Sequence, residues 1–170
     1  MRSPAARRAL ALSRRNARSR RGLPHDPPTG ADRQPPAVPK RVLIVEDNEP
    51  SRRLLHDLLE AHGYEVLQAR DGITSVQLAR QHLPDLILMD LQLPDISGLD
   101  ATRRLKRGRR TRAIPVVAVT AFAMAGDEQR SLASGCDAYV AKPIRVQEFL
   151  RLVREFVSAP RRPDTVPELA

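Results

Sequence analysis

The chain has 170 residues, of which 41% are apolar and 3% aromatic. A chain of this length can bury one sizeable core, and that core must rest mainly on Leu, Ile, Val and Ala because Trp is absent. No apolar run approaches the roughly eighteen residues that span a bilayer, which predicts a protein without a membrane segment. The single cysteine, Cys136, excludes an intrachain disulfide, so we expect the reducing cytoplasm as the compartment.

The positive charge is concentrated at the start of the chain. The formal net charge is +9, and residues 1–40 account for +8 of it, with nine Arg and one Lys against Asp26 and Asp32. Residues 1–39 are also rich in Pro and lack apolar periodicity, which predicts a disordered extension. Its composition fits an organelle transit peptide or a polybasic arm. A start codon assigned too far upstream would equally explain the extension, and the sequence alone leaves these alternatives open.

The folded part begins with two pairs of a strand and a helix. Apolar residues 42–45 predict the first strand. A helix is expected from near Pro50 to a stop at Gly63, with a buried face formed by four leucines: Leu54, Leu55, Leu58 and Leu59. Residues 64–69 predict a less apolar strand at the sheet edge, and Asp71 can cap the second helix.

The second half of the chain continues the alternation. Residues 85–89 predict a fully apolar strand, and residues 98–107 predict the third helix. Two further strands are expected at residues 116–119 and 138–141, separated by a helix over residues 126–134. The last helix has the clearest periodicity, with apolar residues at helical spacing: Val146, Phe149, Leu150, Val153, Phe156 and Val157.

Five strands alternating with five helices predict a doubly wound α/β domain over residues 40–158, followed by a flexible tail at residues 159–170. Continuous apolar strands are typical of a parallel sheet that helices cover on both faces. We expect the flavodoxin-like five-stranded parallel sheet with strand order 2-1-3-4-5, which puts the switch point between the first and third strands. Ligands bind such sheets outside the carboxyl ends of the strands.

Reactive side chains directly follow four of the predicted strands: Glu46 and Asp47, Asp90, Thr120, and Lys142. Three carboxylates at one edge repel one another, so they need a proton or a cation nearby. Mg²⁺ suits oxygen ligands, whereas zinc would want a cluster of Cys or His. An Asp at such a site can attack phosphorus, and the acyl phosphate can pair with Lys142 and accept a hydrogen bond from Thr120.

This set of residues, with Pro143 after Lys142, resembles the signature of response-regulator receiver domains, and the resemblance covers about residues 40–158. Longer stretches are similar to the single-domain regulators of bacterial cell division and polarity: residues 42–49, 85–94 and 114–124. The basic extension departs from that pattern.

The resemblance implies a role for each carboxylate. Asp90 would accept a phosphoryl group from a phosphohistidine and would contribute to a Mg²⁺ site. Asp47 and the backbone carbonyl of Gln92 would bind the ion directly, and Glu46 would bind it through water.

The resemblance also implies how the signal would leave the site. Thr120, Phe122 and Tyr139 would form the switch, and the bond between Lys142 and Pro143 would be cis. The expected partners are sensor histidine kinases, acting as kinase or phosphatase, and histidine phosphotransfer proteins. The protein would not be an enzyme with a separate substrate, although it would assist its own phosphorylation and dephosphorylation.

Three other functions stay open. A stand-alone receiver could act as a phosphate sink. An aspartate-nucleophile phosphatase would need an acid two positions after the nucleophile, where this chain has Gln92. Association with nucleic acid would rest on the basic arm, because no dedicated DNA-binding domain is evident.

Two remaining features favour structural interpretations. The basic run at residues 103–112 suits a solvated helix C-terminus at the opposite edge of the sheet from Asp90. Cys136 has no evident resolving cysteine, so we expect it to be a small packing residue.

Overall fold

The computed structural model describes residues 38–121 and 126–158. The predicted switch residue Phe122, most of the predicted extension and the predicted tail at residues 159–170 lie outside this part of the chain. Nothing in the structure therefore tests these three predictions.

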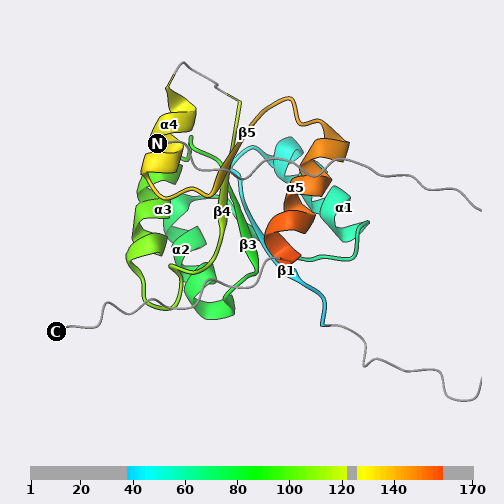
Figure 1. Cartoon of the computed structure of the whole chain (residues 1–170), viewed down its shortest axis with the longest axis horizontal. Helices are drawn as coiled ribbons and strands as arrows, with labels where there is room; N and C mark the ends of the chain where they lie inside the picture. The colour runs from blue at the N-terminus through cyan, green and yellow to red at the C-terminus, as the bar shows by residue number, and fades with distance from the viewer. Residues whose placement is uncertain (1–37, 122–125, 159–170) are drawn as a thin grey trace, which may run out of the picture. The chain divides into compact units, whose positions relative to one another are not determined.

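Strands and helices alternate from the first element to the last (Figure 1). Their bounds are β1 Arg41–Val45, α1 Glu49–Glu60, β2 Glu65–Ala69, α2 Gly72–His82, β3 Leu86–Met89, α3 Gly98–Arg107, β4 Val116–Thr120, α4 Asp127–Ala133, β5 Ala138–Ala141 and α5 Val146–Ser158. The five strands are parallel and follow the order β2-β1-β3-β4-β5. The predicted doubly wound sheet with order 2-1-3-4-5 is therefore confirmed.

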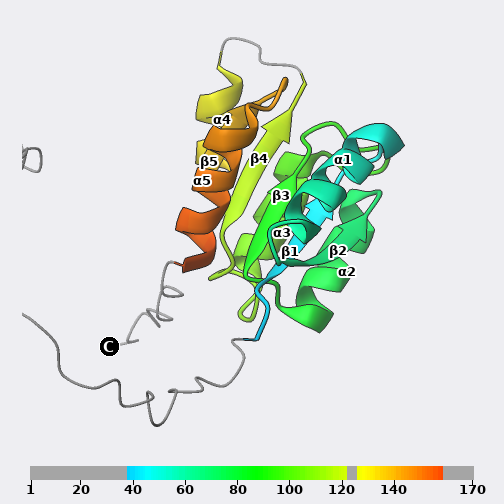
Figure 2. The same cartoon turned by 90° about the vertical axis from the view of Figure 1, so that its right-hand side faces the viewer.

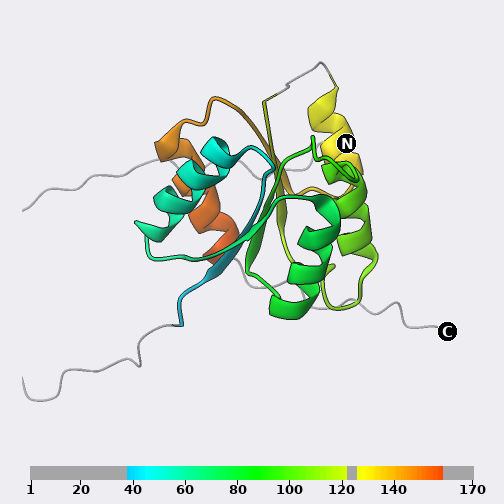
Figure 3. The same cartoon turned by 180° about the vertical axis from the view of Figure 1, so that it is seen from behind.

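Helices cover both faces of the sheet. Figure 1 shows α1 and α5 on one face and α2, α3 and α4 on the other, and Figure 3 shows the same division from behind. Side chains of β1 alternate between the two cores: Leu43 and Val45 pack in the core with Ala101 and Leu105 of α3, whereas Val42 and Ile44 pack in the core with α1 and α5. This alternation follows from the period of two in a strand, and it explains why both faces of the sheet are apolar.

The helices α1, α2 and α3 each begin with a side-chain cap, which fixes where the preceding strand-to-helix loop ends. Asn48, Asp71 and Ser97 accept hydrogen bonds from backbone N–H groups in the first turns of α1, α2 and α3. Such caps satisfy backbone donors that have no partner inside the helix. The sequence predicts the cap of α2 by Asp71, and the structure confirms it.

The buried face of α1 differs from the prediction. Leu55 and Leu59 are buried, but the side chain of Leu54 is 64% exposed. The third member of the buried face is Arg52, which is only 4% exposed. Residues 52, 55 and 59 lie on one helical stripe, whereas residue 54 is turned about 100° from residue 55, so the run of leucines is not one face.

The carboxyl ends of the strands lie together at one edge of the sheet, which Figure 2 shows with the sheet turned toward the viewer. The loops at this edge carry the predicted site residues that directly follow the strands: Glu46, Asp47, Asp90, Gln92, Lys142 and Pro143. The two described switch residues lie within strands, Thr120 at the end of β4 and Tyr139 inside β5. In the described ranges, we find no helix with the length and hydropathy that a bilayer span requires.

Candidate functional site

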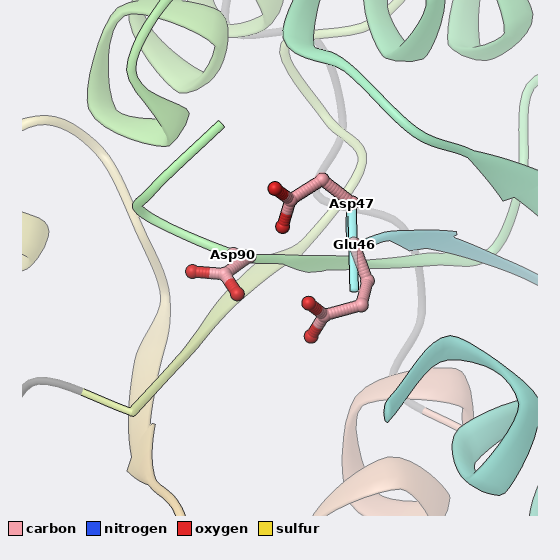
Figure 4. Close-up of side chains that lie close together, drawn as sticks. All are labelled: Glu46, Asp47 and Asp90. Atoms are coloured by element: carbon pink, nitrogen blue, oxygen red, sulfur yellow. The ribbon is translucent and has the colours of Figure 1, made fainter. Parts of the chain in front are cut away.

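Three carboxylates meet where β1 and β3 end. These strands are neighbours, and Val45 pairs with Met89 in the register, so Glu46 and Asp90 follow paired positions. One carboxylate oxygen from each of Glu46, Asp47 and Asp90 lies within 4.8 Å of the others. Figure 4 shows the three side chains grouped at this edge. The sequence predicted this convergence from residues that lie far apart in the chain.

Lys142 joins the cluster from the end of β5. Its Nζ donates a hydrogen bond to Glu46 and lies 3.3 Å from Asp90 Oδ2. The peptide bond between Lys142 and Pro143 is cis, the isomer that the resemblance implied. A cavity of about 370 Å³ opens over the cluster, and its lining also includes Asn48, Ser51, Gln92 and Ala121.

Burial and charge shift the proton affinities of the central ion pair. Glu46 is 2% exposed, and this burial raises the pKa of its carboxyl. The ion pair with Lys142 lowers this pKa and the charge of Asp90 raises it, and the net direction is upward. Burial by itself would lower the pKa of Lys142, but the hydrogen bond to Glu46 and the charges of Asp90 and Glu46 raise it overall. The ammonium therefore stays charged and offsets part of the repulsion among the carboxylates.

The arrangement of the three carboxylates suits a hard cation. Glu46 and Asp90 are buried and Asp47 is exposed, so the cluster has an inner wall and an open side. The backbone N–H of Gln92 donates to Asp90 Oδ1 at 2.9 Å, which fixes the orientation of that carboxylate. The described residues that line the cavity offer oxygen ligands and neither thiol nor imidazole, which is the donor set that Mg²⁺ prefers.

The described switch residues lie at two different places. Thr120 ends β4, is 1% exposed, and its carbonyl accepts a hydrogen bond from the backbone N–H of Lys142 at 2.8 Å. Tyr139 lies on β5, partly buried against the core, and it lines a second hollow between β5 and α5. Their proposed coupling remains a prediction.

Reasoning from the sequence did not identify three residues that hold the loops of the site in place through contacts outside the cavity. Arg52 donates from Nη1 to the carbonyl oxygens of Glu46 and Asp47 at 2.9 and 3.2 Å. The carboxylate of Asp95 accepts hydrogen bonds from two backbone N–H groups at the start of α2, both at 2.8 Å, and so fastens the β3–α3 loop. Gly98 packs so closely on the Asp90 carbonyl that a Cβ atom would overlap it.

One of these residues had a signal in the sequence. Arg52 shares the spacing i, i+3 and i+7 with Leu55 and Leu59, and a charged residue on an apolar stripe is rarely buried without polar partners. Asp95 and Gly98 gave no comparable signal, because their partners come from other elements.

Comparisons with known proteins agree with this geometry. The model of the response regulator receiver domain matches residues 42–154. The chain is 52% identical over 120 residues to the polar-differentiation response regulator DivK of Brucella anthropi, which covers 71% of this chain and 98% of that protein.

Solved structures are similar as well. The receiver domain of the sensor histidine kinase PA1611 from Pseudomonas aeruginosa, solved with a magnesium ion in its active site cleft, is 34% identical with a TM-score of 0.68, covering 72% of this chain and 100% of that one. A putative response regulator from Chloroflexus aurantiacus is 29% identical with a TM-score of 0.69, at the same coverage. The chain therefore belongs to the response-regulator receiver domain family.

Proposed function

We propose that this protein is a response regulator of a phosphorelay, in which Asp90 accepts a phosphoryl group from a phosphohistidine. The observation that carries the proposal is the meeting of Asp90 with two further carboxylates and the Lys142 ammonium around one open cavity. Asp90 is 7% exposed, so an incoming phosphoryl group would reach its carboxylate only through that cavity.

The acidic residues would hold a Mg²⁺ ion. Asp47, Asp90 and the backbone carbonyl of Gln92 would bind it directly, and Glu46 would bind it through water. The donor set of the cavity supports this assignment, as does the magnesium ion in the receiver domain of PA1611. When bound, the ion would neutralise charge on the phosphoryl oxygens.

The residues of the chain account for the rest of the transfer. A carboxylate oxygen of Asp90 attacks phosphorus, the bond between phosphorus and the imidazole nitrogen breaks, and its electron pair stays on that nitrogen. The Gln92 N–H holds Asp90 Oδ1, which orients the nucleophile. Lys142, already 3.3 Å from Asp90 Oδ2, can move its ammonium to a phosphoryl oxygen.

Phosphorylation of Asp90 would add charge and acceptor oxygens beside Lys142, at the sheet edge where β4 ends with Thr120. Two charge-assisted hydrogen bonds, each worth about 1.5–3 kcal/mol, are enough to shift a two-state equilibrium that includes Phe122 and Tyr139. A hollow of about 300 Å³ on the face of β5 and α5 supports protein binding there, and its lining includes Tyr139, Pro143, Phe149 and Leu152.

The partners and the setting follow from the similarity to DivK. We propose sensor histidine kinases, acting as kinase or phosphatase, and histidine phosphotransfer proteins as partners, in cytoplasmic control of cell division and polarity. The protein would be no enzyme with a separate substrate, because its own side chain is the acceptor of the phosphoryl group.

Phosphorylation by a small donor with a phosphorus–nitrogen bond tests the proposal without a cognate kinase. With phosphoramidate and Mg²⁺, the full chain should gain one phosphoryl group by intact-mass spectrometry, and Asp90→Asn should gain none. The matched control is Asp57→Asn, which removes an exposed carboxylate on α1 and should be modified like the wild type. Equal modification of Asp90→Asn would remove Asp90 as the acceptor.

A further inference from the structure

Arg52 is a buried cation directly behind the acidic cluster. It lies in α1, is 4% exposed, and shares its helical stripe with Leu55 and Leu59. A guanidinium is almost never buried unless its charge is compensated. Among the described residues, no carboxylate lies within ion-pair distance of Arg52, and its hydrogen bonds go to the backbone of the loop that follows β1.

The two acceptors of Arg52 are the carbonyl oxygens of Glu46 and Asp47, at 2.9 and 3.2 Å from Nη1. A peptide unit is planar, so holding its carbonyl also fixes the direction of its N–H group. The N–H of the Asp47–Asn48 peptide unit points to the other side and donates to Glu46 Oε1 at 3.1 Å.

A continuous chain of contacts therefore runs from the core to the cavity. Arg52 holds the Asp47 carbonyl, the same peptide unit holds Glu46 Oε1, and the second oxygen of Glu46 accepts from Lys142. Asn48 also caps α1 through Ser51 N at 3.0 Å, so the loop is fixed from two sides.

From this geometry we infer that Arg52 is a positioning residue for the metal site: it acts through the Asp47–Asn48 peptide unit to hold the Glu46 and Asp47 carboxylates in the arrangement that binds Mg²⁺. The inference rests on the proposed function, because it assumes that the acidic cluster is a cation site. Arg52 itself does not line the cavity, so it would touch neither the ion nor the phosphoryl group.

Two effects of Arg52 on a cation have opposite signs, which makes the inference testable. Its positive charge repels Mg²⁺, so removing the charge alone would tighten binding. Its hydrogen bonds preorganise the ligands, so losing them would weaken binding, and loss of a group that orients metal ligands typically costs about 10–100-fold in affinity. Weaker binding after removal of Arg52 can therefore come only from lost positioning.

The experiment is calorimetric titration of the metal-free full chain with Mg²⁺. Arg52→Met should bind Mg²⁺ about tenfold more weakly than the wild type. The matched control is Arg53→Met, because Arg53 is the next residue on the same helix, with a side chain 82% exposed and only a 3.9 Å ion pair to Asp57. This control should stay within about twofold of the wild type.

The outcomes separate the inference from the proposed function. Wild-type or tighter Mg²⁺ binding by a folded Arg52→Met would overturn the role of Arg52 alone. A wild-type chain that binds no Mg²⁺ would overturn the metal site and the inference together. If Arg52→Met shows no cooperative thermal unfolding, Arg52→Gln decides in the same way, since its neutral and shorter side chain should also weaken binding, and unchanged or tighter binding would overturn the inference.

Discussion

Lys142 Nζ lies 3.3 Å from Asp90 Oδ2, although the two residues are 52 positions apart in the chain. The contact exists because β3 and β5 flank β4 in a parallel sheet, so their carboxyl ends share one edge. Lys142 also pairs with Glu46, which makes this ammonium the internal counter-ion of the acidic cluster.

An internal counter-ion competes with a bound cation. Lys142→Met should therefore bind Mg²⁺ more tightly than the wild type, by roughly fivefold or more, because the repulsion between ammonium and Mg²⁺ is removed in a partly buried site. Calorimetric titration measures the change. This sign is opposite to the one expected for Arg52→Met.

The control for Lys142 is Lys40→Met. Lys40 precedes β1 and pairs with Asp85 at 3.4 Å, at the other end of the strands. Its removal should leave Mg²⁺ binding unchanged. Weaker binding by Lys142→Met would show that this side chain holds the carboxylates in place rather than competing with the ion.

The start of α3 depends on a glycine. A Cβ atom on Gly98 would overlap the carbonyl oxygen of Asp90 and lie 2.9 Å from Leu91 Cα, and these backbone atoms cannot yield as a flexible side chain can. Gly98→Ala should lower the free energy of unfolding by about 3 kcal/mol, measured by urea denaturation.

Gly63→Ala is the matched control for Gly98→Ala. Gly63 has a φ of 82°, but a Cβ atom there would meet nothing within 4 Å. Only backbone strain should result, at a cost of about 1–2 kcal/mol. Equal losses for the two variants would mean that α3 shifts to accommodate the methyl group.

The apolar runs of the strands are the part of the sequence that predicts most of the fold and the position of the site. Runs buried on both faces, such as residues 86–89, define a parallel sheet, and the residue after each run must lie at the carboxyl edge. This is why the sequence alone places Asp90 and Lys142 at one site. Glu46 and Asp47 are predicted at the same site for the same reason, because they follow the apolar run at residues 42–45.

The supporting contacts could not be predicted in this way. The burial of Arg52 depends on two carbonyl oxygens that only the folded loop presents, and the role of Asp95 depends on the packing of the β3–α3 loop against α2. Four leucines in six residues suggest one apolar face that includes Leu54, whereas the helical stripe passes through Arg52 instead. The leucine pattern therefore did not identify the buried face of α1, and it does not show which polar groups a loop will bring to that face.

Asp95 should make the stability of the domain depend on pH. Burial opposes ionisation of this carboxyl, but the hydrogen bonds from the backbone N–H groups of Gly72, Ile73, Ile96 and Asp95 together outweigh that effect and lower the pKa of Asp95. A lowered pKa in the folded state means that the stabilisation is fully present above the unfolded value near 3.9 and is lost as the pH falls through the folded value.

Asp95→Asn should therefore be less stable than the wild type at pH 6, and the difference should shrink as the pH falls below about 4. Urea denaturation at both pH values measures it. Glu155→Gln, which removes an exposed carboxylate of α5, is the control and should show no such convergence. A difference between Asp95→Asn and the wild type that is constant with pH would assign the effect to shape rather than charge.

Cys136 should be inert while the domain is folded. Its side chain is 5% exposed and its Sγ lies 3.8 Å from Thr102 Oγ1. Burial raises the pKa of the thiol, and the opposing effects of Thr102 and Lys106 do not cancel it. The reactive thiolate is therefore scarce as well as shielded.

Alkylation by iodoacetamide should be at least roughly tenfold slower for native Cys136 than for the chain unfolded in guanidinium, because reaction requires local opening. The control is a chain whose one thiol lies at the surface: Ala133→Cys in a Cys136→Ala background. Residue 133 is exposed on α4, so its thiol should react at similar rates in the native and unfolded chains. Rapid alkylation of native Cys136 would contradict the packing role, because it would require α4 or the α4–β5 loop to open readily and expose the sulfur.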